Sequence, residues 1–157
     1  MTDTMENLRL MVRDADDLSV ASALLQDAII PGGDIEFDRR AGEFILIANR
    51  FCWERAPLAG LSSSDGKPVH ERRLCAVRVC QVAAVQRQNW PEQPADCLFN
   101  LLALRYLDMA EDGRPAQALQ FDFSDGASLR LKIDRLHLLV ADLDAGHYTS
   151  LQPAHDA

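Results

Sequence analysis

A strict alternation of apolar and polar side chains runs through residues 119–133 and does most to limit what this chain can fold into. Apolar residues take every second position of 119–123 and again of 129–133, and Asp125-Gly126 between them is a turn sequence. Side chains on a β-strand point to opposite faces in turn, so the pattern predicts an antiparallel hairpin. One face of this hairpin should lie in the core and the other in water.

Other segments predict further strands. Residues 8–12 form a short apolar run, and residues 34–51 predict a second hairpin with a turn near residue 40. Residues 74–85 are apolar almost throughout, which is typical of a strand covered on both faces. Residues 98–107 fit a helix face or a strand, and we favour a strand for the second half, leaving 97–101 open.

Two segments predict helices. Asp14 is an N-cap residue, acidic residues follow in the first turn, and apolar residues then recur at helical spacing up to a Pro31-Gly32 stop. This predicts an early helix near 15–30. A second apolar stripe, capped by Asp134, predicts a C-terminal helix near 134–144.

Together these elements predict an α+β fold with about seven strands, mostly antiparallel because the connections are short. A sheet of this size must curl or be covered, so we expect a curled sheet or a partly open barrel with the C-terminal helix at one end. This arrangement resembles the pleckstrin-homology-like fold. We expect one globular domain over 1–148 and a flexible tail over 149–157.

Composition limits the classes of function. The chain has 157 residues, of which 48% are hydrophobic, and a formal charge of −8. The apolar content is sufficient for a core, and the acidic balance disfavours nucleic acid and anionic membranes as partners. The N-terminal residues lack the features of a signal peptide and no apolar run could span a bilayer. We therefore expect a cytoplasmic protein whose four cysteines are reduced.

No set of residues predicts catalysis. Cys75 and Cys80 lack the spacing of a zinc site, and the four histidines are scattered along the chain. All four cysteines lie in apolar stretches, where burial makes a thiol inert. The chain also lacks a phosphate-binding loop and a nucleophile elbow. We therefore predict no catalytic residues, no metal site and no cofactor.

One candidate binding surface remains. Residues 34–90 contain nine basic and seven acidic residues, whereas the segments on either side are strongly acidic, and both tryptophans lie in this middle segment. Arg and Trp are the side chains most often found at binding hot spots. We predict that Arg50, Trp53, Arg72 and Arg73 contact a protein or acidic peptide partner. The other interpretation is intramolecular: Arg72 or Arg73 pairs with Glu54 or Glu71, and Trp53 only covers the core.

Three hypotheses about function follow. The first is a non-catalytic binding or adaptor module that uses these four residues. The second is a small-molecule binding protein, or an enzyme without a known motif, with a pocket at the barrel mouth. The third is a homo-oligomer that pairs through a strand edge.

A resemblance extends over nearly the whole chain. Residues 8–25, the sequence Asn49-Arg50-Phe51-Cys52-Trp53-Glu54 and the sequence Glu71-Arg72-Arg73 resemble those of an uncharacterised family of small, mainly alphaproteobacterial proteins that carry a domain of unknown function. The resemblance implies no activity.

Overall fold

The computed structural model describes residues 7–53 and 71–143. Within them it contains one α-helix, two short 3-10 helices and ten strands. In chain order these are β1 (Arg9–Val12), α1 (Ala15–Leu24), β2 (Ile29–Pro31), η1 (Gly32–Asp34), β3 (Ile35–Asp38), β4 (Glu43–Phe51), β5 (Arg72–Val79), β6 (Val82–Gln88), η2 (Pro94–Asp96), β7 (Leu98–Glu111), β8 (Arg114–Phe123), β9 (Ser128–Ile133) and β10 (Leu138–Asp142). The predicted antiparallel sheet with an early helix is confirmed, with ten strands in place of about seven.

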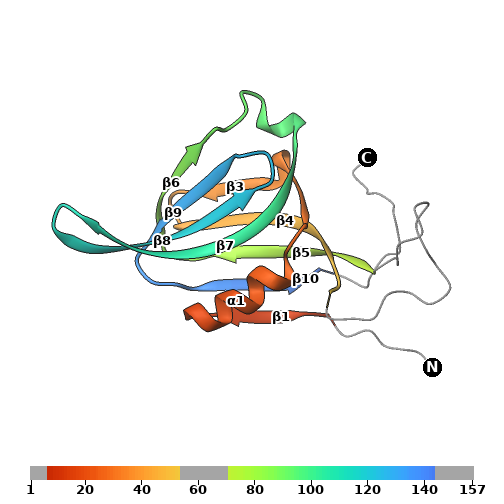
Figure 1. Cartoon of the computed structure of the whole chain (residues 1–157), viewed down its shortest axis with the longest axis horizontal. Coiled ribbons are helices and arrows are strands. Elements are labelled where there is room, and N and C mark those ends of the chain that lie inside the picture. Colours follow the sequence, from red (N-terminus) through yellow and green to blue (C-terminus); the bar gives the residue numbers. More distant parts are fainter. Residues whose placement is uncertain (1–6, 54–70, 144–157) are drawn as a thin grey trace.

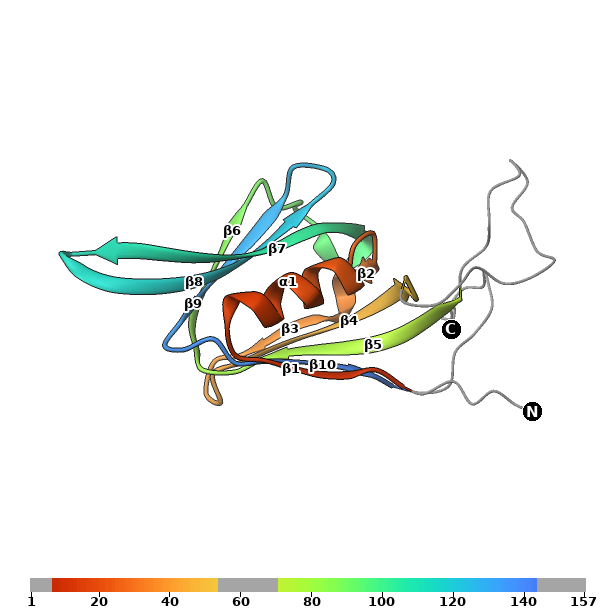
Figure 2. The same ribbon diagram turned by 60° about the horizontal axis from the view of Figure 1, so that its bottom comes forward.

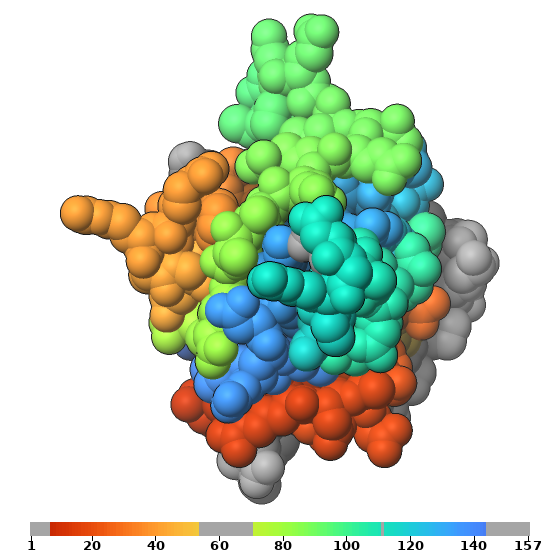
Figure 3. All heavy atoms as spheres, turned by 90° about the vertical axis from the view of Figure 1, so that its left-hand side faces the viewer, coloured from red at the N-terminus to blue at the C-terminus, as the bar shows by residue number. Residues whose placement is uncertain are grey.

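All ten strands belong to one antiparallel sheet that curls without closing. Its order is β1-β10-β5-β4-β2-β7-β8-β9-β6, and β3 pairs with β4 alone. Figure 1 shows the curl, with β1 and β10 on one side of the molecule and β6, β8 and β9 on the other. Figure 3 shows the end of the molecule where the turn after β3, drawn in orange, lies beside β6, drawn in green.

Helix α1 covers the open side of the curl (Figure 2), with one face buried and the other exposed. The side chain of Asp14 accepts a hydrogen bond from the backbone N–H of Asp17 at 2.8 Å, so the predicted N-cap is confirmed. Leu18 and Ala21 are buried, and Figure 2 shows the helix between β7 and the strands β1 and β10. The helix ends at Leu24, before the predicted stop, and β2 follows it.

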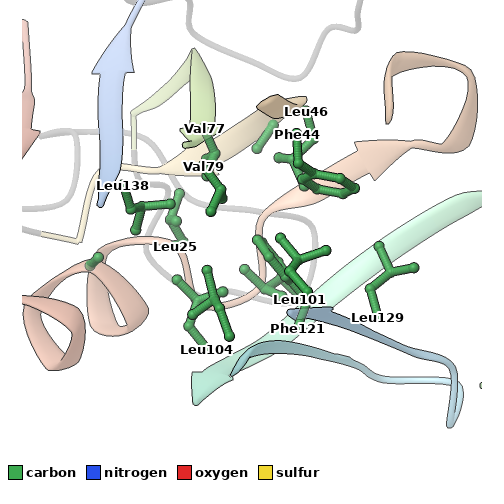
Figure 4. Close-up of a cluster of buried hydrophobic side chains, with 14 of the residues drawn as sticks. Leu25, Phe44, Leu46, Val77, Val79, Leu101, Leu104, Phe121, Leu129 and Leu138 are labelled. Carbon is green, nitrogen blue, oxygen red and sulfur yellow. The ribbon is translucent and has the colours of Figure 1, made fainter. Parts of the chain in front are cut away.

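The core fills the space between the two sides of the curl. Phe44 on β4 and Phe121 on β8 face each other with ring centroids 5.8 Å apart. Figure 4 shows Leu25, at the end of α1, among side chains from β4, β5, β7 and β10. Strands distant in the chain therefore share one apolar interior, and the period-two pattern of β4 and β9 determines which side chains enter it.

The predicted C-terminal helix near 134–144 is wrong. Residues 138–142 form β10, which pairs with β1 on one side and with β5 on the other. The stripe of Leu136, Leu139 and Val140 fits a helix, but Leu138–Ala141 is also an unbroken apolar run. A strand between two others satisfies its backbone hydrogen bonds across both edges, which a local pattern does not predict.

The long apolar run at 74–85 forms two strands, not one. β5 ends at Val79 and β6 begins at Val82, and Gln81 between them has a positive φ of 59°. The ambiguous segment 97–101 is strand from Leu98 onward. Both predicted hairpins are confirmed, as β3–β4 and β8–β9. The predicted tail at 149–157 lies outside the described residues, and the extent of the domain stays a prediction.

Candidate functional site

The four predicted binding residues come from the end of β4 and the start of β5. Arg50 is paired with Arg73 across these two strands, and the adjacent pair is Phe51 with Arg72. Residues paired across an antiparallel ladder share a face, and neighbouring pairs alternate between faces. Arg50 and Arg73 therefore point into the curl, whereas Phe51 and Arg72 lie on the outer face of the sheet.

The two inward arginines are held by acidic side chains. Arg50 donates to Asp142 from Nε at 2.9 Å and from Nη2 at 3.0 Å. Arg73 donates from Nε to Glu71 Oε2 at 2.8 Å, and its Nη1 lies 3.7 Å from Asp142 Oδ2. Both arginines are 1% exposed. The interpretation of intramolecular pairing is therefore confirmed for Arg73 and Glu71.

The buried ionic cluster of Arg50, Glu71, Arg73 and Asp142 also involves the start of the chain. Arg73 Nη1 donates to Asn7 Oδ1, and Asp142 Oδ2 accepts from the backbone N–H of Leu8 at 2.7 Å. The cluster thus joins the ends of β4, β5 and β10 to the residues before β1. Buried charges are stable only when paired and hydrogen-bonded, so these contacts fix the strand ends that carry the outer residues.

Arg72 differs from its two neighbours. Its guanidinium lies over the ring of Phe51, 4.2 Å from the centroid. Its Nε and Nη2 atoms are buried and have no hydrogen-bond partner among residues 7–53 and 71–143, although the side chain as a whole is partly exposed. Burial lowers the pKa of Arg72 from its ordinary value, but an arginine remains charged at neutral pH. This pair of donors is the same edge of the guanidinium that Arg50 presents to a carboxylate.

Trp53 extends the surface beside Phe51. The two ring centroids are 5.1 Å apart, and Trp53 is 39% exposed. Its Nε1 donates to the carbonyl of Gln26 at 2.9 Å, which anchors the indole next to the end of α1. We call Arg72, Phe51 and Trp53 the outer stack. It contains a cation, two aromatic faces and two hydrogen-bond donors without acceptors.

The outer stack contains one residue that sequence reasoning missed and leaves out two that it proposed. Phe51 was missed, although it is the last residue of β4 and lies two residues before Trp53, a spacing that favours the same side if the chain continues extended. Arg50 follows Phe44 and Leu46 at the same two-residue spacing, which indicates an inward side chain. Asp142 was missed as an acceptor because its segment had been predicted to be a helix.

The described cysteines show no sign of reactivity. Burial raises the pKa of the Cys75 thiol to about 12, against an opposing effect of Arg50. Cys52 and Cys75 are fully buried, and Cys80 and Cys97 are partly exposed. Among residues 7–53 and 71–143, no three side chains of the His, Cys, Asp and Glu types are grouped so as to hold a metal ion. His70, His147 and His155 lie outside these ranges.

A cavity opens at the side of the curl between β3 and β6, which do not pair. Its volume is about 380 Å³, and Phe44, Trp90 and Leu129 line it together with Arg87 and Glu92. Trp90 stacks on the buried ring of Phe99 with ring centroids 4.6 Å apart. This cavity lies away from the outer stack.

Comparisons with known proteins identify a family without an activity. In the part of the chain that the structure describes, no helix has the length and apolar character needed to cross a membrane. Neither the curated proteins nor the solved structures contain a match to this chain. The family described as "Protein of unknown function (DUF2948)" matches residues 8–155. The chain therefore belongs to the DUF2948 family.

Proposed function

We propose that the protein is a non-catalytic binding module that holds an acidic peptide segment of a partner protein at the outer stack. The observation that carries this proposal is the pair of buried donors of Arg72, Nε and Nη2, for which no described residue provides an acceptor. A buried donor without a partner costs about 1–3 kcal/mol. A carboxylate that accepts from both atoms relieves that cost and matches the shape of the guanidinium edge.

Arg50 provides an internal example of this contact. The same two atoms, Nε and Nη2, donate to the two carboxylate oxygens of Asp142. Arg72 is partly exposed but these two atoms are buried, so binding a partner's carboxylate requires the guanidinium to turn toward solvent. The ring of Phe51 lies against the guanidinium, with 4.2 Å between the ring centroid and the guanidinium carbon, and supports it through a cation–π contact.

Trp53 adds contact area and Arg50 and Arg73 act as positioning residues. An exposed indole beside a cation is typical of the centre of an interface, where Trp and Arg contribute most of the binding energy. Arg50 and Arg73 are buried in ion pairs and hold the ends of β4 and β5 in register. In this proposal they do not touch the partner.

Affinity capture from a cytosolic extract tests the proposal. The wild-type protein is expected to retain a partner that Arg72→Ala and Trp53→Ala each lose. Arg40→Ala, which removes an exposed arginine from the turn between β3 and β4, is the matched control and should retain the partner. Retention should weaken with added salt, because the contact includes an ion pair near the surface. Identical partners for wild type and Arg72→Ala would overturn the proposal.

A second candidate function is small-molecule binding at the cavity between β3 and β6. The observation that favours it is the pair of aromatic lining residues, Trp90 and Phe44, together with the charged lining residues Arg87 and Glu92. A volume of this size is in the range of ligand pockets. A thermal-shift screen against metabolites tests it, since a ligand raises the unfolding temperature by mass action. No stabilisation by any compound would count against this candidate.

The proposal includes a cytoplasmic location and excludes nucleic acid as the partner. The net charge of −8 disfavours the binding of polyanions such as nucleic acid. The positive charge of Arg72 attracts a single carboxylate locally. The proposal does not use the pleckstrin-homology-like interpretation, because that interpretation needs the C-terminal helix and residues 138–142 form β10.

A further inference from the structure

The curled sheet has a seam at which it does not close. Among the described strands, β3 pairs with β4 alone and β6 pairs with β9 alone, so each of them keeps one unpaired edge. The cavity between β3 and β6 lies in this seam, because Ile35 on β3 and Arg87 on β6 both line it. We call it the seam cavity. Openings of this kind, at the side or mouth of a curled sheet, are common places for small ligands.

The seam cavity reaches the apolar core. Phe44 and Leu129, which line it, are each 1% exposed and belong to the buried hydrophobic cluster. Ile35 and Trp90 also line it and pack against the same cluster while remaining partly exposed. An apolar group that enters the cavity would therefore lie against aliphatic and aromatic side chains, and its removal from water would favour binding.

The charged part of the lining consists of one residue of each sign. Among the described residues that line the seam cavity, only Arg87 and Glu92 are charged. Arg87 lies near the end of β6, and Glu92 lies in the segment between β6 and η2. Both are exposed, and neither forms an ion pair with a described residue. One donor of positive charge and one carboxylate are thus available to a ligand beside an apolar cavity.

These two charges select against a ligand with a single charge. An anion that is attracted to Arg87 also meets the negative charge of Glu92, and a cation that is attracted to Glu92 also meets Arg87. A ligand that carries both charges has an attractive contact with each residue and no net charge. The cavity volume of about 380 Å³ is near the lower end of the range for ligand pockets, which favours a small molecule over a peptide.

We propose that the seam cavity binds a free α-amino acid with an apolar side chain. Arg87 donates to its carboxylate, Glu92 accepts from its ammonium group, and its side chain lies against the apolar lining. The proposal rests on the second candidate function, small-molecule binding at this cavity, and names the class of ligand. It does not involve the outer stack.

A nuclear magnetic resonance titration of the full-length protein tests the proposal. The probes are L-phenylalanine and L-leucine, each compared with one analogue that lacks the ammonium group and one that lacks the carboxylate. These are hydrocinnamate and phenethylamine for phenylalanine, and isocaproate and isoamylamine for leucine. At least one amino acid should shift the backbone amide signals of Ile35 and Arg87 in a saturable way. Each of its analogues should bind about tenfold more weakly, because a charge-assisted hydrogen bond is lost.

Two variants assign the contacts. Arg87→Gln should weaken binding of the amino acid about tenfold but not that of the amine analogue, which has no carboxylate. Glu92→Gln should do the same for the amino acid but not weaken binding of the analogue without an ammonium group. Arg114→Gln and Asp108→Asn, at exposed positions on β8 and β7, are the matched controls and should leave the affinity unchanged.

The wild-type measurements decide the outcome even if a variant fails to fold, which circular dichroism would show. Absence of any shift up to the solubility limit of both amino acids would overturn the proposal, as would analogues that bind as tightly as the amino acid. If the metabolite screen finds a ligand of another class at this cavity while both amino acids fail, the second candidate function stands and only the ligand named here is wrong. If no compound of any class binds, both are wrong.

Discussion

Arg50 and Asp142, which are 92 residues apart in the chain, form a bidentate ion pair at the centre of the buried ionic cluster. β4 and β10 are not neighbours in the sheet, because β5 lies between them. The pair therefore spans a strand on the inner side of the curl, and the Arg73 side chain of that middle strand lies 3.7 Å from the same carboxylate. The side chain of Asp142 on β10 therefore contacts arginines on both β4 and β5, which stabilises the alignment of these three strands.

Removing this carboxylate should destabilise the fold strongly. Asp142→Ala leaves Arg50 buried without its acceptors, and breaking a buried pair in this way costs about 3–5 kcal/mol. Urea unfolding followed by circular dichroism measures the loss. Arg105→Ala is the control, because Arg105 pairs with Asp122 at the surface, where a salt bridge contributes about 0–1 kcal/mol. Equal losses for the two variants would contradict the assigned role of Asp142.

Gly32 is predicted to resist substitution. A Cβ at this position would lie 1.8 Å from the carbonyl oxygen of Pro94, because η1 and η2 approach closely there. Gly32→Ala should therefore cost about 1–3 kcal/mol through forced movement of the backbone. At Gly33 the nearest atom to an added Cβ is 3.8 Å away, so Gly33→Ala should be close to neutral. Thermal unfolding of the two variants checks the difference.

Cys75 should not react in the folded protein. With a pKa of about 12, its thiolate fraction at pH 8 is about one in ten thousand, and the side chain is fully buried. Maleimide labelling followed by peptide mass mapping should modify Cys75 only after unfolding, and modify the partly exposed Cys97 earlier. Labelling of Cys75 at the rate of Cys97 in the native protein would show that the β4–β5 end opens readily.

The free energy of unfolding should depend on pH through Asp122, which pairs with Arg105 at the surface. Burial raises the pKa of Asp122, but hydrogen bonds from Arg105 and Gln120 and the charges of Arg105 and Arg130 outweigh it, so the pKa lies below its ordinary value. This group stabilises the fold above the pKa it has in the unfolded chain, and the contribution disappears as pH falls through its lower folded pKa. Urea midpoints should therefore fall less in acid for Asp122→Asn than for wild type.

A nuclear magnetic resonance titration gives a direct check of that mechanism. In Arg105→Ala the pKa of Asp122 should rise toward its ordinary value, because both the hydrogen bond from Arg105 and the positive charge of Arg105 are removed. An unchanged titration of Asp122 in this variant would assign the shift to Gln120 and Arg130.

The candidate site shows how far a local pattern extends. The two-residue period that places Phe44, Leu46 and Ala48 in the core also places Arg50 there, and the same rule puts Phe51 and Trp53 together outside. The side of the sheet on which each residue lies was thus predictable. The acceptor of Arg50 was not, because Asp142 lies on β10, which is distant in the chain and is brought near β4 by pairing with β5.

The sequence by itself determined the hairpins β3–β4 and β8–β9 and the start of α1 at Asp14. These elements depend on contacts between residues near in the chain: strand period, turn residues and an N-cap. Only the tertiary structure decided that residues 138–142 form a strand, that the run at 74–85 breaks at Gln81, and that Arg72 lies outside while Arg73 is buried with Glu71. The physical reason is that backbone groups and charges must find partners across the sheet, and those partners are distant in the chain.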